Sequence, residues 1–128
     1  MKELIIPFES VILTEAAAAD ATESVVGRLY CIEYRPNDVD TNADLTVTCV
    51  GAGAVSKTLL VKANAGTSDC WFYPRDIEHA VSNGAALTAT AGGDRECPIL
   101  QGVVHVAVAA CGATTIRYGT IIIYWEPL

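Results

Sequence analysis

The C-terminal segment departs from the alternation of apolar and polar residues that a strand with one wet face shows. It reads "RYGTIIIYWEPL" (117–128), with five consecutive apolar or aromatic residues from Ile121 to Trp125. Successive side chains of a strand point to opposite faces of the sheet, so a run without alternation predicts a strand that is covered on both faces. This pattern places Ile122, Tyr124 and Trp125 among the candidate interface residues.

A second strand-like segment, "GVVHVAVAACG" (102–112), also has little polar face. Val104, Val106 and Val108 share one face, and the other face carries small residues and His105. Exposed apolar surface of several hundred Å² usually marks an interface. Two such strands in a short chain predict that another subunit or another protein covers part of the outside. His105 is expected to be a hydrogen-bonded core or interface residue, with a pH-sensitive role at a subunit contact as the alternative.

Short strand-like segments separated by turns recur along the whole chain, and no long amphipathic helix interrupts them. Pro7 in the opening segment indicates an edge strand or a bulge, because proline cannot donate to a sheet ladder. The alanine-rich segment 15–23 is expected to form a helical turn or two, or a loop, and a brief strand is possible at 86–90. The pattern predicts an all-β fold: a single antiparallel β-sandwich, jelly-roll-like, with at most one short helix and one domain over 1–128. A small barrel remains an alternative.

Composition excludes several classes of protein. Of the 128 residues, 15 are Asp or Glu and 8 are Lys or Arg, which gives a net charge of −7 and argues against nucleic-acid binding. No window approaches the roughly 20 apolar residues of a membrane span. The N-terminal "MKELIIPFES" lacks the apolar core of a signal peptide, so we expect synthesis in a cytoplasm. The five cysteines are odd in number and form no C-x-x-C pair. They are expected to be free thiols packed as small hydrophobes, with a disulfide or a reactive thiol as the alternative.

The acidic segment "RPNDVDTNAD" is the only weak candidate for a metal site. Asp38, Asp40, Asn42 and Asp44 stand at alternate positions, as the oxygen ligands of a calcium loop do. The glycine and the bidentate glutamate of such a loop are absent, and no helices are expected on either side. Asp and Asn are also common turn formers, because their side chains bond nearby backbone amides. We therefore interpret the segment as a solvated loop and expect neither a metal nor a cofactor.

The aromatic segment "CWFYPRDIEH" is expected to be a short strand that ends at a proline. We interpret Trp71 and Tyr73 as an aromatic anchor at a corner of the sandwich. Arg75 would then be free to pair with acids of this chain or of a neighbour. All three are candidate interface residues. An alternative uses Trp71, Tyr73 and Trp125 as flat surfaces for stacking against a sugar.

An enzymatic interpretation of the same segment is weaker. It would make Cys70 a nucleophile with His79 or His105 as its base. Cys70 stands among bulky aromatics, and no oxyanion-hole motif such as G-x-S-x-G accompanies it. We therefore expect a protein that is not an enzyme.

The second half of the chain, from about residue 70 to residue 126, is similar to a group of small structural proteins of tailed bacteriophage virions. The shared features are an aromatic-Tyr-Pro-Arg stretch, a turn into "GAAL", alternating valines before a glycine turn, and a final "GT-I-I-Y-E" strand. The matching positions are Tyr73, Pro74, Arg75, Gly84, Ala85, Ala86, Leu87, Val104, Val106, Val108, Gly112, Gly119, Thr120 and Glu126.

This resemblance implies a capsid decoration (cement) protein, made in the host cytoplasm and located on the capsid surface of the virion. Proteins of that type are commonly β-sandwich or jelly-roll trimers that bind the major capsid protein from outside. The expected partners are thus the major capsid protein and further copies of this chain, with no nucleic acid and no membrane. Two alternatives remain open: a head–tail joining or neck protein, and a carbohydrate- or receptor-binding β-sandwich on the virion.

Overall fold

The computed structural model of the chain describes residues 1–51, 53, 55–77 and 95–128. Over these residues the secondary structure is β-strand joined by turns, without an α-helix. The prediction of an all-β, antiparallel fold is confirmed. The part of the chain that the structure describes contains no helix able to span a membrane. The strand considered at 86–90 lies outside the described residues.

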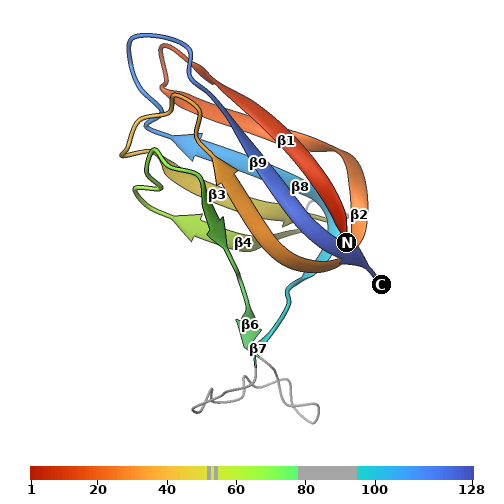
Figure 1. Cartoon of the computed structure of the whole chain (residues 1–128). Helices are drawn as coiled ribbons and strands as arrows, with labels where there is room; N and C mark the ends of the chain where they lie inside the picture. The colour runs from red at the N-terminus through yellow and green to blue at the C-terminus, as the bar shows by residue number, and fades with distance from the viewer. Residues whose placement is uncertain (52, 54, 78–94) are drawn as a thin grey trace.

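Seven of the strands form one hydrogen-bonded antiparallel network, with six of them in the order β1-β9-β2-β8-β3-β4 and β5 joined to β2. Two further short strands, β6 and β7, pair with each other in a ribbon below the main body (Figure 1). The strands are β1 (Lys2–Val11), β2 (Ala16–Arg35), β3 (Asp44–Val50), β4 (Ser56–Lys62), β5 (Cys70–Phe72), β6 (Asp76–Ile77), β7 (Arg95–Glu96), β8 (Ile99–Ala109) and β9 (Tyr118–Pro127).

Strand β2 belongs to both layers of the sandwich. Its first half pairs with β8, and its second half pairs with β9 and β5. Between the halves the strand curves from one layer into the other (Figure 1). We call β1, β9, β5 and the second half of β2 the β9 layer, and β8, β3, β4 and the first half of β2 the β8 layer. At the changeover, a Cβ on Gly27 would lie 2.2 Å from the Glu126 carbonyl oxygen and 2.6 Å from the Trp125 ring, so only glycine fits there.

The core lies between the inner faces of the two layers. Ile6, Ile32 and Ile123 of the β9 layer are fully buried, as are Val47 and Val106 of the β8 layer. In β8 the burial follows the alternation predicted from the sequence, and β3 alternates in the same way: Leu45, Val47, Cys49, Val104, Val106 and Val108 point inward. Removing this apolar surface from water is the main driving force for folding.

Two local expectations have opposite outcomes. Pro7 does lie in an edge strand, since β1 stands at the end of the strand order. The expectation of a helical turn or a loop in the alanine-rich segment is wrong, because residues 16–23 form the start of β2. Ala17 and Ala21 are buried there, and Ala17 pairs with Val108 of β8, so packing outweighs the weak strand propensity of alanine.

Candidate binding surfaces

The outer face of the β9 layer carries a stacked aromatic pair. Trp71 of β5 lies directly opposite Glu33 of β2, and its indole reaches across β2 to Tyr124 of β9. The two ring centroids are 5.2 Å apart, with 30° between the ring planes. Trp71 is nevertheless 48% exposed, so the stack leaves a large part of the indole open to solvent.

A buried carboxylate holds this pair in place. The Tyr124 hydroxyl donates a hydrogen bond of 2.8 Å to Oε1 of Glu33. Arg35 donates from Nε to Oε2 over 2.6 Å and from Nη2 to Oε1 over 3.2 Å. The Arg35 guanidinium lowers the pKa of Glu33, and the bond to Glu33 raises the pKa of Tyr124 to about 12. We call Trp71, Tyr124, Glu33 and Arg35 the aromatic platform.

The Tyr-Pro-Arg stretch forms a clamp beside the platform. A register shift between Leu29 and Cys31 makes Tyr30 an extra, outward residue of β2. Arg75 donates from Nη1 to the carbonyls of Tyr30 at 2.9 Å and Pro74 at 2.7 Å. Its guanidinium also lies 5.7 Å from the Tyr30 ring centroid and 6.0 Å from that of Tyr73.

Within this clamp, the Tyr30 and Tyr73 rings meet edge to face with centroids 6.2 Å apart. Arg75 thus links the end of β5 to β2 through the backbone carbonyl of Tyr30, whereas the sequence suggested a pair with an acidic side chain. Tyr73 remains exposed at the rim of the clamp. The matching positions 84–87 of the phage resemblance lie outside the described residues.

Two of the expected interface residues turn out to be buried within the single chain. Trp125 points into the core and is 6% exposed, and Ile122 on the outer face is 4% exposed. Strand β9 lies between β1 and β2, so Ile122 is flanked by Ile5 on one side and Glu33 on the other. The chain itself therefore covers the second face of the Ile122 position. Neither side chain offers much surface to a partner, and Trp125 is not available for stacking against a sugar.

His105 lies on the outer face of the other layer. Its Nδ1 is 2.6 Å from Oδ1 of Asp20, the residue opposite it on β2. Cys70 belongs to the β9 layer, and burial raises the pKa of its thiol. The structure thus places these two members of the enzymatic alternative on different layers. His79 lies outside the described residues.

The acidic loop uses two of its carboxylates to bind backbone amides. Oδ1 of Asp38 accepts a bond of 2.7 Å from the amide of Tyr118, and Oδ1 of Asp44 accepts one of 3.0 Å from the amide of Asn64. Asp40 and Asn42 are exposed. In residues 1–51, 53, 55–77 and 95–128, no cluster of three or more His, Cys, Asp or Glu side chains is arranged to hold a metal ion.

The turn between β1 and β2 presents a second surface, which the sequence pattern did not single out. Val11 at the end of β1 and Ile12 and Leu13 of the turn are exposed, together with Ile116 from the loop before β9. Leu13 is 94% exposed. These residues surround a hollow of about 380 Å³, to which Glu9 also contributes. We call Val11, Ile12, Leu13 and Ile116 the apolar tip.

The apolar tip is built on a well-bonded turn. Ser10 and Arg117 are joined twice at 2.8 Å, from the Ser10 amide to the Arg117 carbonyl and from the Arg117 amide to the Ser10 hydroxyl. The Glu15 amide donates to the Val11 carbonyl at 2.8 Å, and the Glu15 carbonyl accepts from the Cys111 amide at 2.7 Å. The exposed apolar side chains therefore stand on a backbone that four hydrogen bonds hold in place.

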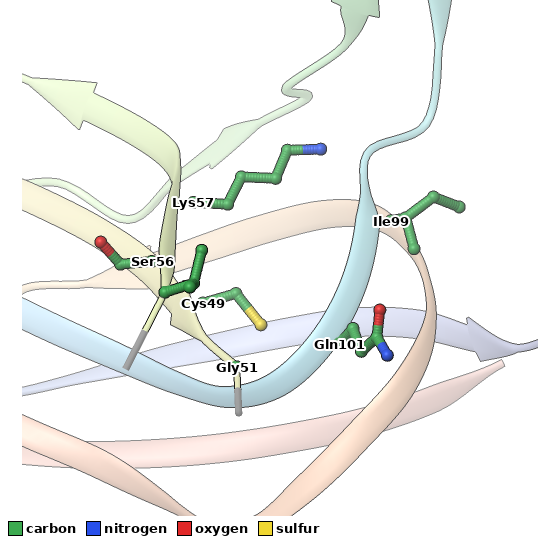
Figure 2. A pocket seen from close by; sticks show the side chains of 7 residues that line it. Cys49, Gly51, Ser56, Lys57, Ile99 and Gln101 are labelled. Carbon is green, nitrogen blue, oxygen red and sulfur yellow. The ribbon is translucent and has the colours of Figure 1, made fainter. Parts of the chain in front are cut away.

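A second hollow, of about 410 Å³, opens between β3, β4 and the start of β8 (Figure 2). Its lining residues are Cys49, Gly51, Val55, Ser56, Lys57, Ile99 and Gln101. None of these is a histidine or a carboxylic acid, so the described lining does not provide a general acid–base pair next to the Cys49 thiol. All five cysteines of the chain are free thiols, and Cys31, Cys49 and Cys111 are buried.

The sequence matches no protein-family model and no curated protein. The fold is similar to that of CBM32-3 from a family 31 glycoside hydrolase of Clostridium perfringens, with a TM-score of 0.54 and 9% identity over 94% of this chain and 75% of that chain. It is also similar to the C-terminal domain of a chitobiase from Bacteroides fragilis, with a TM-score of 0.50 and 5% identity over 88% of this chain and 65% of that chain. A third match, infectious bursal disease virus of the Gt strain, has 10% identity over all of this chain and 36% of that chain. Its TM-score of 0.30 is too low to indicate a shared fold. The first two similarities establish the β-sandwich fold.

Proposed function

We propose that this protein is a non-enzymatic capsid decoration protein of a tailed bacteriophage, which binds the outside of the major capsid shell as a trimer and stabilises it. The resemblance of residues 70–126 to small virion proteins supports this function, and the β-sandwich fold is the one that the resemblance implies. The apolar tip is the structural observation on which the proposal rests.

A decoration protein needs a surface that loses water when it meets the shell. Leu13 projects from the turn with almost no contact to its own chain, and Val11 and Ile116 flank it. Burial of apolar area contributes about 25 cal/mol per Å². The bonded turn beneath these side chains lowers the entropy that docking costs, because the backbone is ordered before contact. Three tips in a trimer would engage the shell together, which converts a modest affinity per tip into strong avidity.

The charge of the chain favours decoration over a head–tail joining or neck role. A neck protein surrounds the path of the DNA and benefits from basic residues on its inner surface. This chain has a net charge of −7. The packaged DNA repels an acidic protein. A net negative charge therefore suits the outer surface of a shell better than the path of the DNA.

Binding to shells tests the proposal directly. Shells are prepared from a phage that lacks this protein, mixed with the purified chain and sedimented. We expect saturable binding, a higher melting temperature of the shells, and a trimer by light scattering. Leu13→Asp should weaken binding roughly tenfold or more, because a charge would enter the contact.

The matched control is Val61→Asp, which places the same charge at an exposed valine of β4, outside the apolar tip. This variant should bind as the wild type does. Absence of binding by the wild type, or equal binding by Leu13→Asp, would refute the proposed function.

A further inference from the structure

We propose that the aromatic platform is a glycan-binding site, at which a pyranose ring stacks on the exposed part of the Trp71 indole. This site is separate from the apolar tip and does not depend on the capsid function. Tyr124 of the platform and Tyr118 at the tip end of β9 are six residues apart in one strand, which corresponds to roughly 20 Å.

The indole of Trp71 is held in position before a ligand binds. One part of Trp71 rests on Tyr124, Tyr124 is bonded to Glu33, and Glu33 is fixed by the two bonds from Arg35. A side chain held in this way loses little conformational freedom when a ligand arrives. Its remaining exposed surface, 48% of the residue, is a flat apolar area that suits the C–H face of a sugar ring.

Polar groups are available around the exposed indole of Trp71. The Arg35 side chain is half exposed, and its Nη1 is not used in the pair with Glu33. Tyr30 and Tyr73 add exposed phenols beside the platform. Sugars need hydrogen-bond partners around the stacked ring, and ligand sites generally combine apolar area with a few placed polar groups.

The structure also decides which aromatic residues contribute. Of the three residues weighed for sugar stacking from the sequence, Trp125 is excluded by its burial. Trp71 supplies the open surface, and Tyr73 stands at the rim in the clamp with Arg75. Tyr124 takes the place that Trp125 was expected to fill, beneath the indole.

Intrinsic fluorescence provides the test, because Trp71 is exposed and the second tryptophan, Trp125, is buried. The purified chain is titrated with soluble oligosaccharides of glucose, galactose, mannose and N-acetylglucosamine. We expect a saturable change in emission, and protection from acrylamide quenching, with at least one of these sugars. Trp71→Ala should weaken binding about tenfold or more, measured by calorimetry with the sugar that binds. Trp71→Phe keeps a smaller flat ring and should retain part of the affinity.

Tyr118→Ala is the matched control, since Tyr118 is also 48% exposed and lies on the same strand. It should leave sugar affinity unchanged. The proposal is overturned if no sugar of the panel binds, or if Trp71→Ala binds sugar as the wild type does. It is also overturned if Trp71→Ala loses shell binding while sugars never bind, because the platform is then a protein contact. If Leu13→Asp binds shells as the wild type does, the proposed capsid function is refuted and the glycan-binding proposal is not affected.

Discussion

The hydroxyl of Tyr124 and the buried carboxylate of Glu33 are joined by a hydrogen bond of 2.8 Å across neighbouring strands of the β9 layer. The same carboxylate receives two bonds from Arg35. A buried charge is tolerated only where it is paired and hydrogen-bonded, and these three donors meet that condition. The platform therefore depends on a single ionised group, and this dependence can be measured.

Glu33→Gln should make the protein less stable and less sensitive to acid. The pKa of Glu33 is lowered mainly by the bond from Arg35, so its contribution to stability is present above the unfolded pKa and is lost as the pH falls through the folded pKa. We expect the variant to lose about 1–2 kcal/mol of unfolding free energy at pH 7, since the Arg35 partner is half exposed. The gap to the wild type should shrink once the pH falls below about 4.3, the ordinary pKa of a glutamate. Urea unfolding across this range gives the result, and a gap that does not change with pH would contradict it.

Tyr34→Phe and Tyr124→Phe should differ in their effects on the free energy of unfolding. Burial is the main cause that raises the pKa of Tyr34 to about 12, and its hydroxyl has no hydrogen-bond partner in the described part of the chain. For Tyr124, the hydrogen bond to Glu33 is the main cause that raises the pKa, also to about 12. Removing the Tyr34 hydroxyl should be neutral or stabilising, whereas Tyr124→Phe should cost about 1–2 kcal/mol.

Alkaline titration at the tyrosinate absorbance band provides a second measurement on the same pair. Because the folded pKa values of both tyrosines lie above the unfolded value of about 10, ionisation opposes folding, and the fold loses stability as the pH rises from about 10 through the folded values. Each variant should remove one late-ionising tyrosine from the curve. An unchanged curve for either variant would show that the tyrosine was assigned wrongly.

Ile122→Asp should unfold the protein before any assembly is considered. The side chain is 4% exposed within the single chain, so the substitution buries a charge without a partner and should cost more than about 3 kcal/mol. Ile5→Asp is the control, because Ile5 lies directly opposite on β1 and is 60% exposed. We expect the control to change stability by less than about 1 kcal/mol. Thermal melts of dilute samples decide between a buried and an open position for Ile122.

Trp71→Ala should expose the thiol of Cys31. Cys31 is buried and lies opposite Tyr124 on β2, the strand between Trp71 and Tyr124, and burial is the largest cause that raises the pKa of its thiol. A thiol of this kind reacts slowly, because the thiolate is the reactive form and access is blocked. Labelling with Ellman's reagent followed by peptide mapping should show faster modification at Cys31 in the variant. Cys49 and Cys111 serve as internal references and should not change.

Much of the fold was accessible from the sequence, because alternation in β3 and β8 records which face each residue buries. The bulge at Tyr30 was not accessible. A single inserted residue changes the face of the residues that follow it, and the run from Cys31 onward gives no turn signal to mark this. The alanines at the start of β2 were misassigned because their burial depends on β8, more than 80 residues further along the chain.

The aromatic platform was found only in part, for a similar reason. The density of aromatic residues drew attention to Trp71, and the C-terminal run drew attention to Tyr124. Glu33 and Arg35 gave no comparable signal, since their role follows from the pairing of β2 with β5 and β9. The same pairing explains why Ile122 is covered without a partner subunit.

The passage of β2 through both layers has a consequence for how the molecule comes apart. Neither layer can be peeled away while the other keeps its hydrogen-bonded ladder, since both ladders share one continuous strand. Local opening is thus expected to be confined to the margins, such as β4 and the β6–β7 ribbon. Amide protons of β8 and β9 should exchange with solvent at the same global free energy, as parts of one cooperative unit.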